Sequence, residues 1–177
     1  MALVRVLRTY LELPDRAAFR GPSHAPPDDA RVERIDPCSV PLYRALYRAV
    51  GERWHWRDQN RRPDAELQAH LDDPNVSMWG LRAPSVVSRD DAGGYAGYFE
   101  LVRRGADVEI LYFGLVPEAI GHRLGGFMLA EAVDRAWSIG ADRVVLNTCT
   151  LDAPQALPNY KARGFVEVRE ESYETEI

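Results

Sequence analysis

The chain has 177 residues, of which 46% are hydrophobic, and this is enough for one soluble globular domain (residues 1–177) with a sizeable core. A net charge of −5 without a basic cluster argues against nucleic acid as a partner, and no apolar run is long enough to span a membrane, so we expect a cytoplasmic protein with no membrane partner. Two cysteines and four scattered histidines provide neither a disulfide framework nor metal-ligand spacing, so no metal is predicted.

The first half of the chain predicts a strand, a long loop and two helices. Residues 2–13 are strand-like, and four prolines between positions 14 and 29 predict an irregular loop. Ser39 is placed to cap a helix that runs to Val50, and Asp64 to cap a shorter one that runs to Leu71. The segment WHWRDQNRRP lies between these two helices.

The second half predicts an antiparallel meander followed by two helices and two further strands. The meander has strands at about 75–81, 95–103 and 107–116. A helix over 124–139 leads into the apolar run RVVLNTCT, which is typical of a buried strand and is predicted to lie parallel to strand 107–116. A short helix that carries Tyr160 and a terminal strand over 165–176 complete the chain.

A glycine-rich turn joins strand 107–116 to the helix that follows it. Gly121, Gly125 and Gly126 allow the backbone to approach a ligand closely. The first N–H groups of a helix have no intrahelical partners and carry partial positive charge, so such a turn binds an anion through its backbone. The spacing matches neither the dinucleotide fingerprint nor the nucleoside-triphosphate loop. The turn therefore predicts another class of phosphate ligand, unless it only lets the helix pack against the sheet.

The turn resembles that of the GNAT superfamily of acyl-CoA-dependent N-acetyltransferases. In that family a V-x-P-type stretch leads to a Gln/Arg-x-x-Gly-x-Gly/Ala turn whose backbone amides hold the pyrophosphate of coenzyme A. Leu115, Val116 and Pro117 match the approach, and residues 120–125, IGHRLG, match the turn. Ile120 and Arg123 depart from the family pattern: the Arg123 side chain either crowds the pyrophosphate or pairs with it, and we favour pairing.

A second match lies downstream, where Ala156, Tyr160 and Gly164-Phe165 keep the family spacing, although Ala153 replaces an asparagine that often opens this motif. The resemblance extends from about Tyr95 to Phe165. It implies an α/β (α+β) fold with a mixed, mostly antiparallel twisted sheet of six or seven strands and about four helices. It also implies transfer of an acetyl group from acetyl-CoA to a primary amine. The residues expected at the coenzyme are Leu115, Val116, Gly121, His122, Arg123, Leu124, Gly125 and Gly126.

The resemblance also suggests catalytic residues. Glu109 lies where a branch of the family has its general base, with Glu100 in reserve, and a cross-strand salt bridge is the alternative role for Glu109. Tyr160 lies where the family has the acid that protonates the coenzyme sulfur, and packing in the core is the alternative. A bulge at Gly114 is expected to free a backbone N–H for the oxyanion.

The amine acceptor is expected near the segment between the first two helices, where Trp54, His55 and Trp56 lie. Packing of the tryptophans on the sheet is the alternative. The acceptor is a small molecule or a peptide, and a homodimer is possible. A rival function is a non-catalytic acyl-CoA-binding sensor or regulatory module, which would bind the coenzyme without releasing its thiol.

Overall fold

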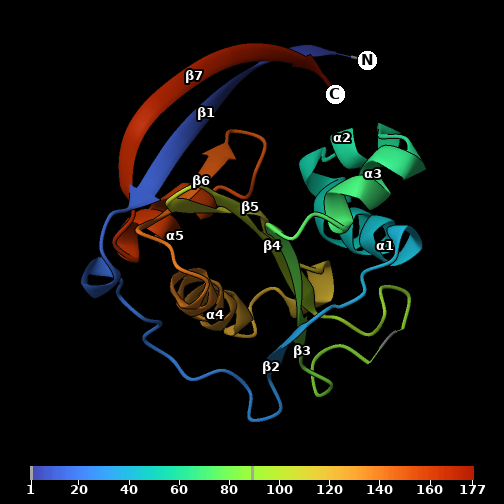
Figure 1. Cartoon of the computed structure of the whole chain (residues 1–177), viewed down its shortest axis with the longest axis horizontal. Coiled ribbons are helices and arrows are strands. Elements are labelled where there is room, and N and C mark those ends of the chain that lie inside the picture. The colour runs from blue at the N-terminus through green and yellow to red at the C-terminus, as the bar shows by residue number, and fades with distance from the viewer. Residues whose placement is uncertain (1, 89) are drawn as a thin grey trace.

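The computed structural model describes residues 2–88 and 90–177. One sheet of seven strands, in the order β2-β3-β4-β5-β6-β1-β7, runs through the molecule (Figure 1). The strands are β1 (Leu3–Leu13), β2 (Arg31–Arg34), β3 (Val76–Arg82), β4 (Gly97–Arg104), β5 (Asp107–Leu115), β6 (Arg143–Cys149) and β7 (Val166–Glu176). The helices are α1 (Val40–Gly51), α2 (Asp58–Arg61), α3 (Asp64–Leu71), α4 (Leu124–Ser138) and α5 (Ala156–Ala162). The predicted mixed, mostly antiparallel fold is confirmed.

The first strand and both early helices lie where the sequence predicts them. Ser39 caps α1, because its hydroxyl accepts a hydrogen bond from the Leu42 N–H at 3.3 Å. The prediction that Asp64 caps α3 was wrong: Pro63 holds the cap position, and the Asp64 carboxylate accepts a hydrogen bond from Arg44 instead. Strand β2 was not predicted, because a strand of four residues at the edge of a sheet is too short to show a period.

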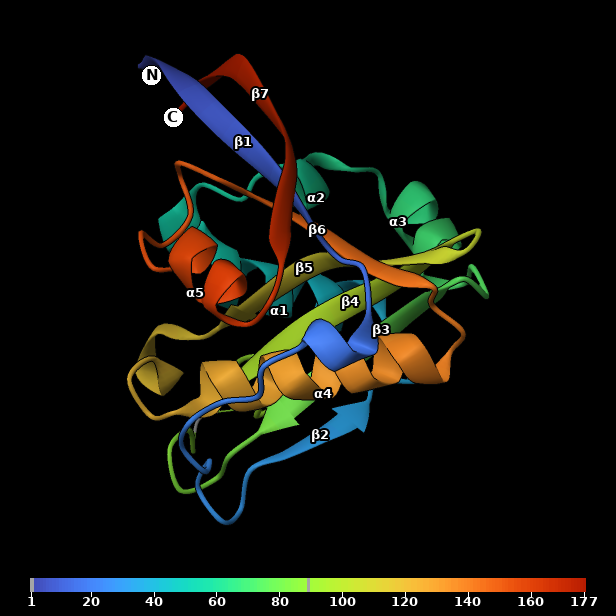
Figure 2. The same ribbon diagram turned by 90° about the vertical axis from the view of Figure 1, so that its left-hand side faces the viewer.

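The helices form a layer on each face of the sheet. Helix α4 packs along β4, β5 and β6 on one face, and α1 and α3 cover β3, β4 and β5 on the other (Figures 1 and 2). Both faces of the central strands are therefore buried, and β4 is apolar or aromatic at nearly every position before its last two residues. Glu100 is the exception, being charged and fully buried.

The meander and the parallel strand are confirmed, and their register creates a gap in the sheet. Strands β3, β4 and β5 pair antiparallel, whereas β5 and β6 pair parallel only over residues 107–109 and 143–145. Beyond these residues β5 and β6 separate. Since strand edges that separate leave peptide groups unpaired, the gap exposes backbone donors and acceptors.

The bulge in β5 lies at Leu111 and not at Gly114, where it was predicted. Tyr112 pairs with Glu100 and Ile110 pairs with Leu101, so Leu111 is the extra residue. Position 114 is glycine for another reason: a Cβ there would collide with the Val50 side chain of α1. A glycine in a strand indicates either a bulge or a close approach, and the close approach applies here.

Candidate active site

A cavity of about 490 Å³ occupies the gap between β5 and β6. Its walls come from both faces of the sheet, because β5 contributes residues 110–115 and β6 contributes residues 146–148. On the α4 face the lining includes residues 120–121 and 123–126, Leu129, Asp152, Ala153, Gln155, Ala156, Asn159, Tyr160 and Arg163. On the α1 face it includes Val50, Trp54 and Trp56. The cavity therefore connects two regions of different chemistry.

The glycine-rich turn forms the wall of the cavity on the α4 face. Gly121 has φ +87°, and Arg123, the N-cap residue of α4, has φ +63° and forms no side-chain cap. The first turn of α4 therefore keeps N–H groups available for an anion. Six of the eight residues predicted to bind the coenzyme line the cavity, namely Leu115, Gly121, Arg123, Leu124, Gly125 and Gly126, whereas Val116 and His122 do not.

The N-terminal loop packs against this wall. We call residues 15–22 the strap, because they run along α4 and contact the C-terminal end of α5 (Figure 2). The Arg20 N–H donates to the Arg163 carbonyl, and the Arg163 guanidinium donates to the Gly21 carbonyl. Pro22 lies against Gly126, where an added Cβ would come within 2.9 Å of the proline ring. The irregular loop predicted from the prolines thus supports the glycine-rich wall of the cavity.

Tyr160 lines the cavity from α5 and has aromatic neighbours. Its ring contacts Phe113 and Phe165 edge-on, with centroids 6.3 and 5.9 Å away. Its hydroxyl forms no hydrogen bond with another described residue. Burial, followed by the negative charge of Asp152, raises the pKa of Tyr160 above its ordinary value of 10.0. The phenol therefore stays protonated and is a potential proton donor.

Several cavity residues were missed by the sequence interpretation. The Asp152 carboxylate accepts hydrogen bonds from the Thr148 hydroxyl at 2.7 Å and the Cys149 N–H at 2.9 Å, which shapes the loop after β6. Tyr112 and Arg163 also line the cavity. Arg163 directly precedes the Gly164-Phe165 pair and could have been selected from that spacing, whereas Tyr112 could not, because the bulge at Leu111 reverses the alternation of the strand.

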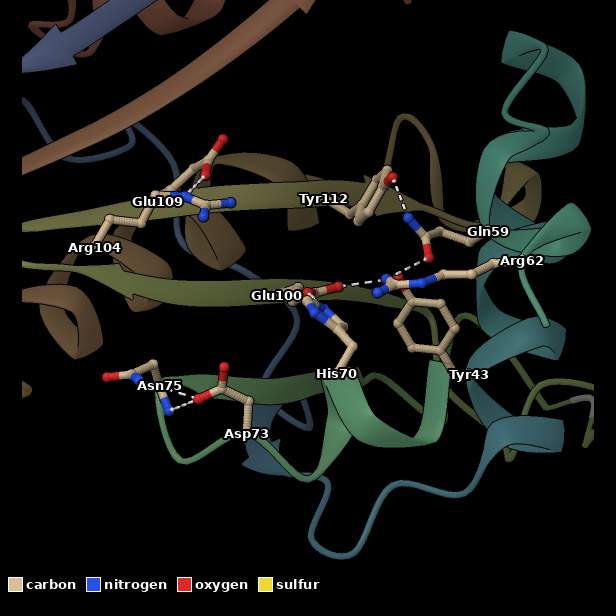
Figure 3. A network of polar contacts seen from close by, with 10 residues as sticks. All are labelled: Tyr43, Gln59, Arg62, His70, Asp73, Asn75, Glu100, Arg104, Glu109 and Tyr112. Carbon is tan, nitrogen blue, oxygen red and sulfur yellow. Dashed lines mark hydrogen bonds and ion pairs between the residues drawn. The ribbon is translucent and has the colours of Figure 1, made fainter. Parts of the chain in front are cut away.

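Glu100, the predicted reserve base, lies at the centre of a buried polar cluster (Figure 3). Its carboxylate accepts a hydrogen bond from the Tyr43 hydroxyl at 3.0 Å and contacts the His70 Nε2. Glu100 is fully buried, whereas the side chain of His70 is 17% exposed. Tyr43 and His70 come from α1 and α3, so the cluster ties both helices to β4.

Glu109, the predicted base, points from the same sheet face as Glu100 and pairs with Arg104 across the hairpin (Figure 3). The ion pair that the sequence offered as an alternative role is therefore present. Neither glutamate lines the cavity. Glu100 lies directly opposite Tyr112, which does line it, whereas Glu109 pairs with Val102 and precedes the lining residue Ile110 in β5.

Aromatic rings form the cavity wall on the α1 face, which we call the aromatic end (Val50, Trp54, Trp56 and Tyr112). The ring centroids of Trp56 and Tyr112 are 5.2 Å apart, and Tyr47 contacts both rings. The Tyr112 hydroxyl accepts a hydrogen bond from Gln59 at 3.0 Å (Figure 3). His55, with φ +60°, turns the chain between the two tryptophans and does not line the cavity.

The described residues hold neither a group of metal ligands nor a helix that could span a membrane. Among residues 2–88 and 90–177, no three or more His, Cys, Asp or Glu side chains are grouped as metal ligands. Within the same ranges no helix combines the length and the apolar composition of a membrane span.

Comparison with solved structures finds the same fold. A GCN5-related N-acetyltransferase from Kribbella flavida superposes with a TM-score of 0.62 at 14% identity, over 97% of this chain and 58% of that one. A Bacillus subtilis acetyltransferase in complex with CoA gives 0.54 at 18% identity, over 77% and 76%. An aminoglycoside acetyltransferase from an uncultured soil metagenomic sample, in complex with sisomicin, gives 0.55 at 12% identity, over 76% and 85%.

This chain spans less than two thirds of the length of several similar structures, 58% for the Kribbella flavida protein and 52% for a GCN5-related N-acetyltransferase from Sphaerobacter thermophilus. A search among curated proteins returned no match. Comparison with protein families matches residues 43–165 to the Acetyltransferase (GNAT) family, and these residues include the glycine-rich turn, Tyr160 and the aromatic end. The chain therefore belongs to the GNAT acetyltransferase family.

Proposed function

We propose that this protein transfers an acetyl group from acetyl-CoA to a primary amine, directly and in a ternary complex. The observation that carries the proposal is the single cavity through the sheet, with an uncapped helix start at one end and aromatic rings at the other. A ligand that enters from each face would meet the other in the gap between β5 and β6. Holding two reactants in one such site lowers the entropic part of the barrier.

The α4 face suits the coenzyme. The pyrophosphate would lie on the N–H groups of residues 121–126, with Arg123 and Arg163 to supply positive charge. The edge of β5 that has separated from β6 offers peptide groups for the pantetheine amides and for the oxyanion. The cofactor contacts would thus be mostly backbone contacts.

Two proton transfers complete the reaction. Tyr160 would protonate the departing thiolate, since its raised pKa keeps the phenol protonated. Glu109 or Glu100 would take the proton of the amine through water, because Glu100 lies opposite the lining residue Tyr112 and Glu109 precedes the lining residue Ile110. The contact between Glu100 and the partly exposed His70 offers that proton a route to solvent.

Thiol release from acetyl-CoA, measured against a panel of amines, tests the proposal. We expect thiol release that depends on the amine. Of Glu109→Gln and Glu100→Gln, the variant that clearly lowers the rate of thiol release identifies the base. Propionyl-CoA and succinyl-CoA in parallel define the acyl donor. If calorimetry shows that acetyl-CoA binds while no amine releases thiol, the protein is a sensor or regulatory module and the proposal fails.

A further inference from the structure

The aromatic end is a preformed platform of rings. Trp56 is held by Tyr47, whose ring centroid lies 5.4 Å away, and by Gly51, where any Cβ would collide with the indole. Tyr112 is held by its hydrogen bond from Gln59. Rings fixed in this way lose little conformational entropy when a ligand binds, and they favour offset or edge-on contact with another flat apolar group.

Charge at the cavity walls does not suit a polycation. The charged lining residues are Arg123, Arg163 and Asp152, and all three lie on the α4 face. Asp152 already accepts two hydrogen bonds from its own loop. A ligand with several ammonium groups would therefore lose its hydration without gaining carboxylate partners, which is costly.

Charged groups around the aromatic end do not change this conclusion. The Arg53 guanidinium stacks on the Trp54 ring at 4.8 Å, and the Arg62 guanidinium lies at 3.5 Å from the Gln59 amide oxygen. The acidic residues near them are Asp58 in α2, Glu52 two residues before Trp54, and the buried Glu100 opposite Tyr112, and none of the three lines the cavity. Among the described lining residues the aromatic end therefore has no carboxylate.

We infer that the amine acceptor is a primary monoamine attached through a short chain to an aromatic ring, an inference that rests on the proposed function. The ring binds against Trp56 and Tyr112, and the amine extends to the gap between β5 and β6. The nitrogen attacks the thioester carbonyl, the C–S bond breaks, the amine proton leaves to a base, and the coenzyme leaves as its thiol. The sisomicin-bound neighbour has the same fold, but the one carboxylate among the described lining residues of this cavity, Asp152, already accepts two hydrogen bonds from its own loop.

A comparison of four amines tests this inference. The value of kcat/KM for thiol release from acetyl-CoA is measured with 2-phenylethylamine, ethylamine, spermidine and sisomicin. We expect phenylethylamine to exceed ethylamine by at least about tenfold, the discrimination that an apolar pocket gives to an added apolar group, and to exceed both polycations by more. Equal values for phenylethylamine and ethylamine, or a higher value for sisomicin, would overturn the inference and leave the proposed function intact.

Variants locate the selectivity. Trp54→Leu and the milder Trp56→Phe are expected to lower the ratio of phenylethylamine to ethylamine several-fold. Trp137→Leu is the matched control, because Trp137 is also half-buried but lies on α4 outside the cavity, and its ratio should equal that of the wild type. The ratio is independent of the fraction of active enzyme, so partial unfolding does not imitate the effect. An unchanged ratio in both cavity variants would place the acceptor elsewhere. Failure of all four amines to release thiol would instead reject the proposed function.

Discussion

The two ends of the cavity are built from different material. On the α4 face the wall is mainly backbone, with three glycines, an uncapped helix start and a strap that packs from behind. On the α1 face the wall is side chain, with two tryptophans and a tyrosine held by their neighbours. The first end suits a ligand that is common to many enzymes. The second suits a ligand that differs from one enzyme to the next.

The difference explains why one end is readable from sequence. A backbone site needs glycine at fixed spacings, so it leaves a motif. An aromatic wall needs only rings of suitable size in the right place, and nothing in their spacing separates a binding wall from core packing. Changes at each end should therefore have separable effects.

Tyr160 lines the cavity from α5, and Tyr160→Phe should have the largest effect. We expect kcat to decrease by about a hundredfold or more, the usual contribution of a positioned acid, while the Kd of acetyl-CoA stays unchanged. Because burial raises the pKa of Tyr160, the phenol of the wild type should remain protonated through pH 10, so its ionisation should not lower the rate at mildly alkaline pH. Stopped-flow thiol release across a range of pH values measures kcat and its pH dependence. An unaltered kcat would assign Tyr160 to packing alone.

Gly125→Val tests whether glycine is needed at this position in order to leave room for the ligand. A Cβ at position 125 would contact only the Leu115 side chain at 3.8 Å, so the free protein should keep its melting temperature. The new side chain would crowd the bound coenzyme and weaken its binding free energy by about 1–3 kcal/mol, which corresponds to roughly a tenfold to hundredfold rise in Kd. Calorimetry with acetyl-CoA measures the Kd.

Gly126→Ala provides the contrast, because its Cβ would press on Pro22 of the strap. We expect this variant to lose stability before it loses affinity. Equal affinity of Gly125→Val and wild type would show that the pyrophosphate does not lie on this turn.

The two glutamates on the α1 side should separate stability from catalysis. Glu100→Gln disturbs a buried carboxylate that contacts Tyr43 and His70, and we expect a loss of about 1–3 kcal/mol in the free energy of unfolding. Glu109→Gln removes a hairpin ion pair with the largely exposed Arg104, which is worth about 0–1 kcal/mol. Urea denaturation gives both values. Whichever variant loses activity beyond its loss of folded protein identifies the base.

The strap should have the smallest effect. Arg163→Gln removes the hydrogen bond to the Gly21 carbonyl and one positive charge from the anion-binding end. We expect the Kd of acetyl-CoA to rise by about two- to fivefold at low salt, equivalent to a hydrogen bond of about 0.5–1 kcal/mol. The difference from wild type should shrink at high salt, since ions screen an exposed charge. Lys161→Gln, two residues earlier in the chain and paired with Glu167, serves as the control for charge alone.

Most of the fold could be predicted from the sequence, and the site only in part. Apolar runs and the Ser39 cap predicted most of the helices and strands, and the turn at 120–125 predicted the cavity wall on the α4 face. The positions of Glu100 and Glu109 could not be predicted, because one extra residue at Leu111 changes which side chains share a face. Likewise, whether a carboxylate is buried against a histidine depends on contacts between β4 and α3 that no local pattern encodes.

The position of β1 between β6 and β7 has a consequence for how the chain is made. Both partners of β1 lie in residues 143–176, so this strand emerges early during synthesis and waits for nearly the whole domain before it can pair. Pairing over such a sequence separation is slow, and an unpaired strand is exposed to aggregation in the meantime. The charged side chains of β1, Arg5, Arg8 and Glu12, would keep it dispersed until the last strand arrives.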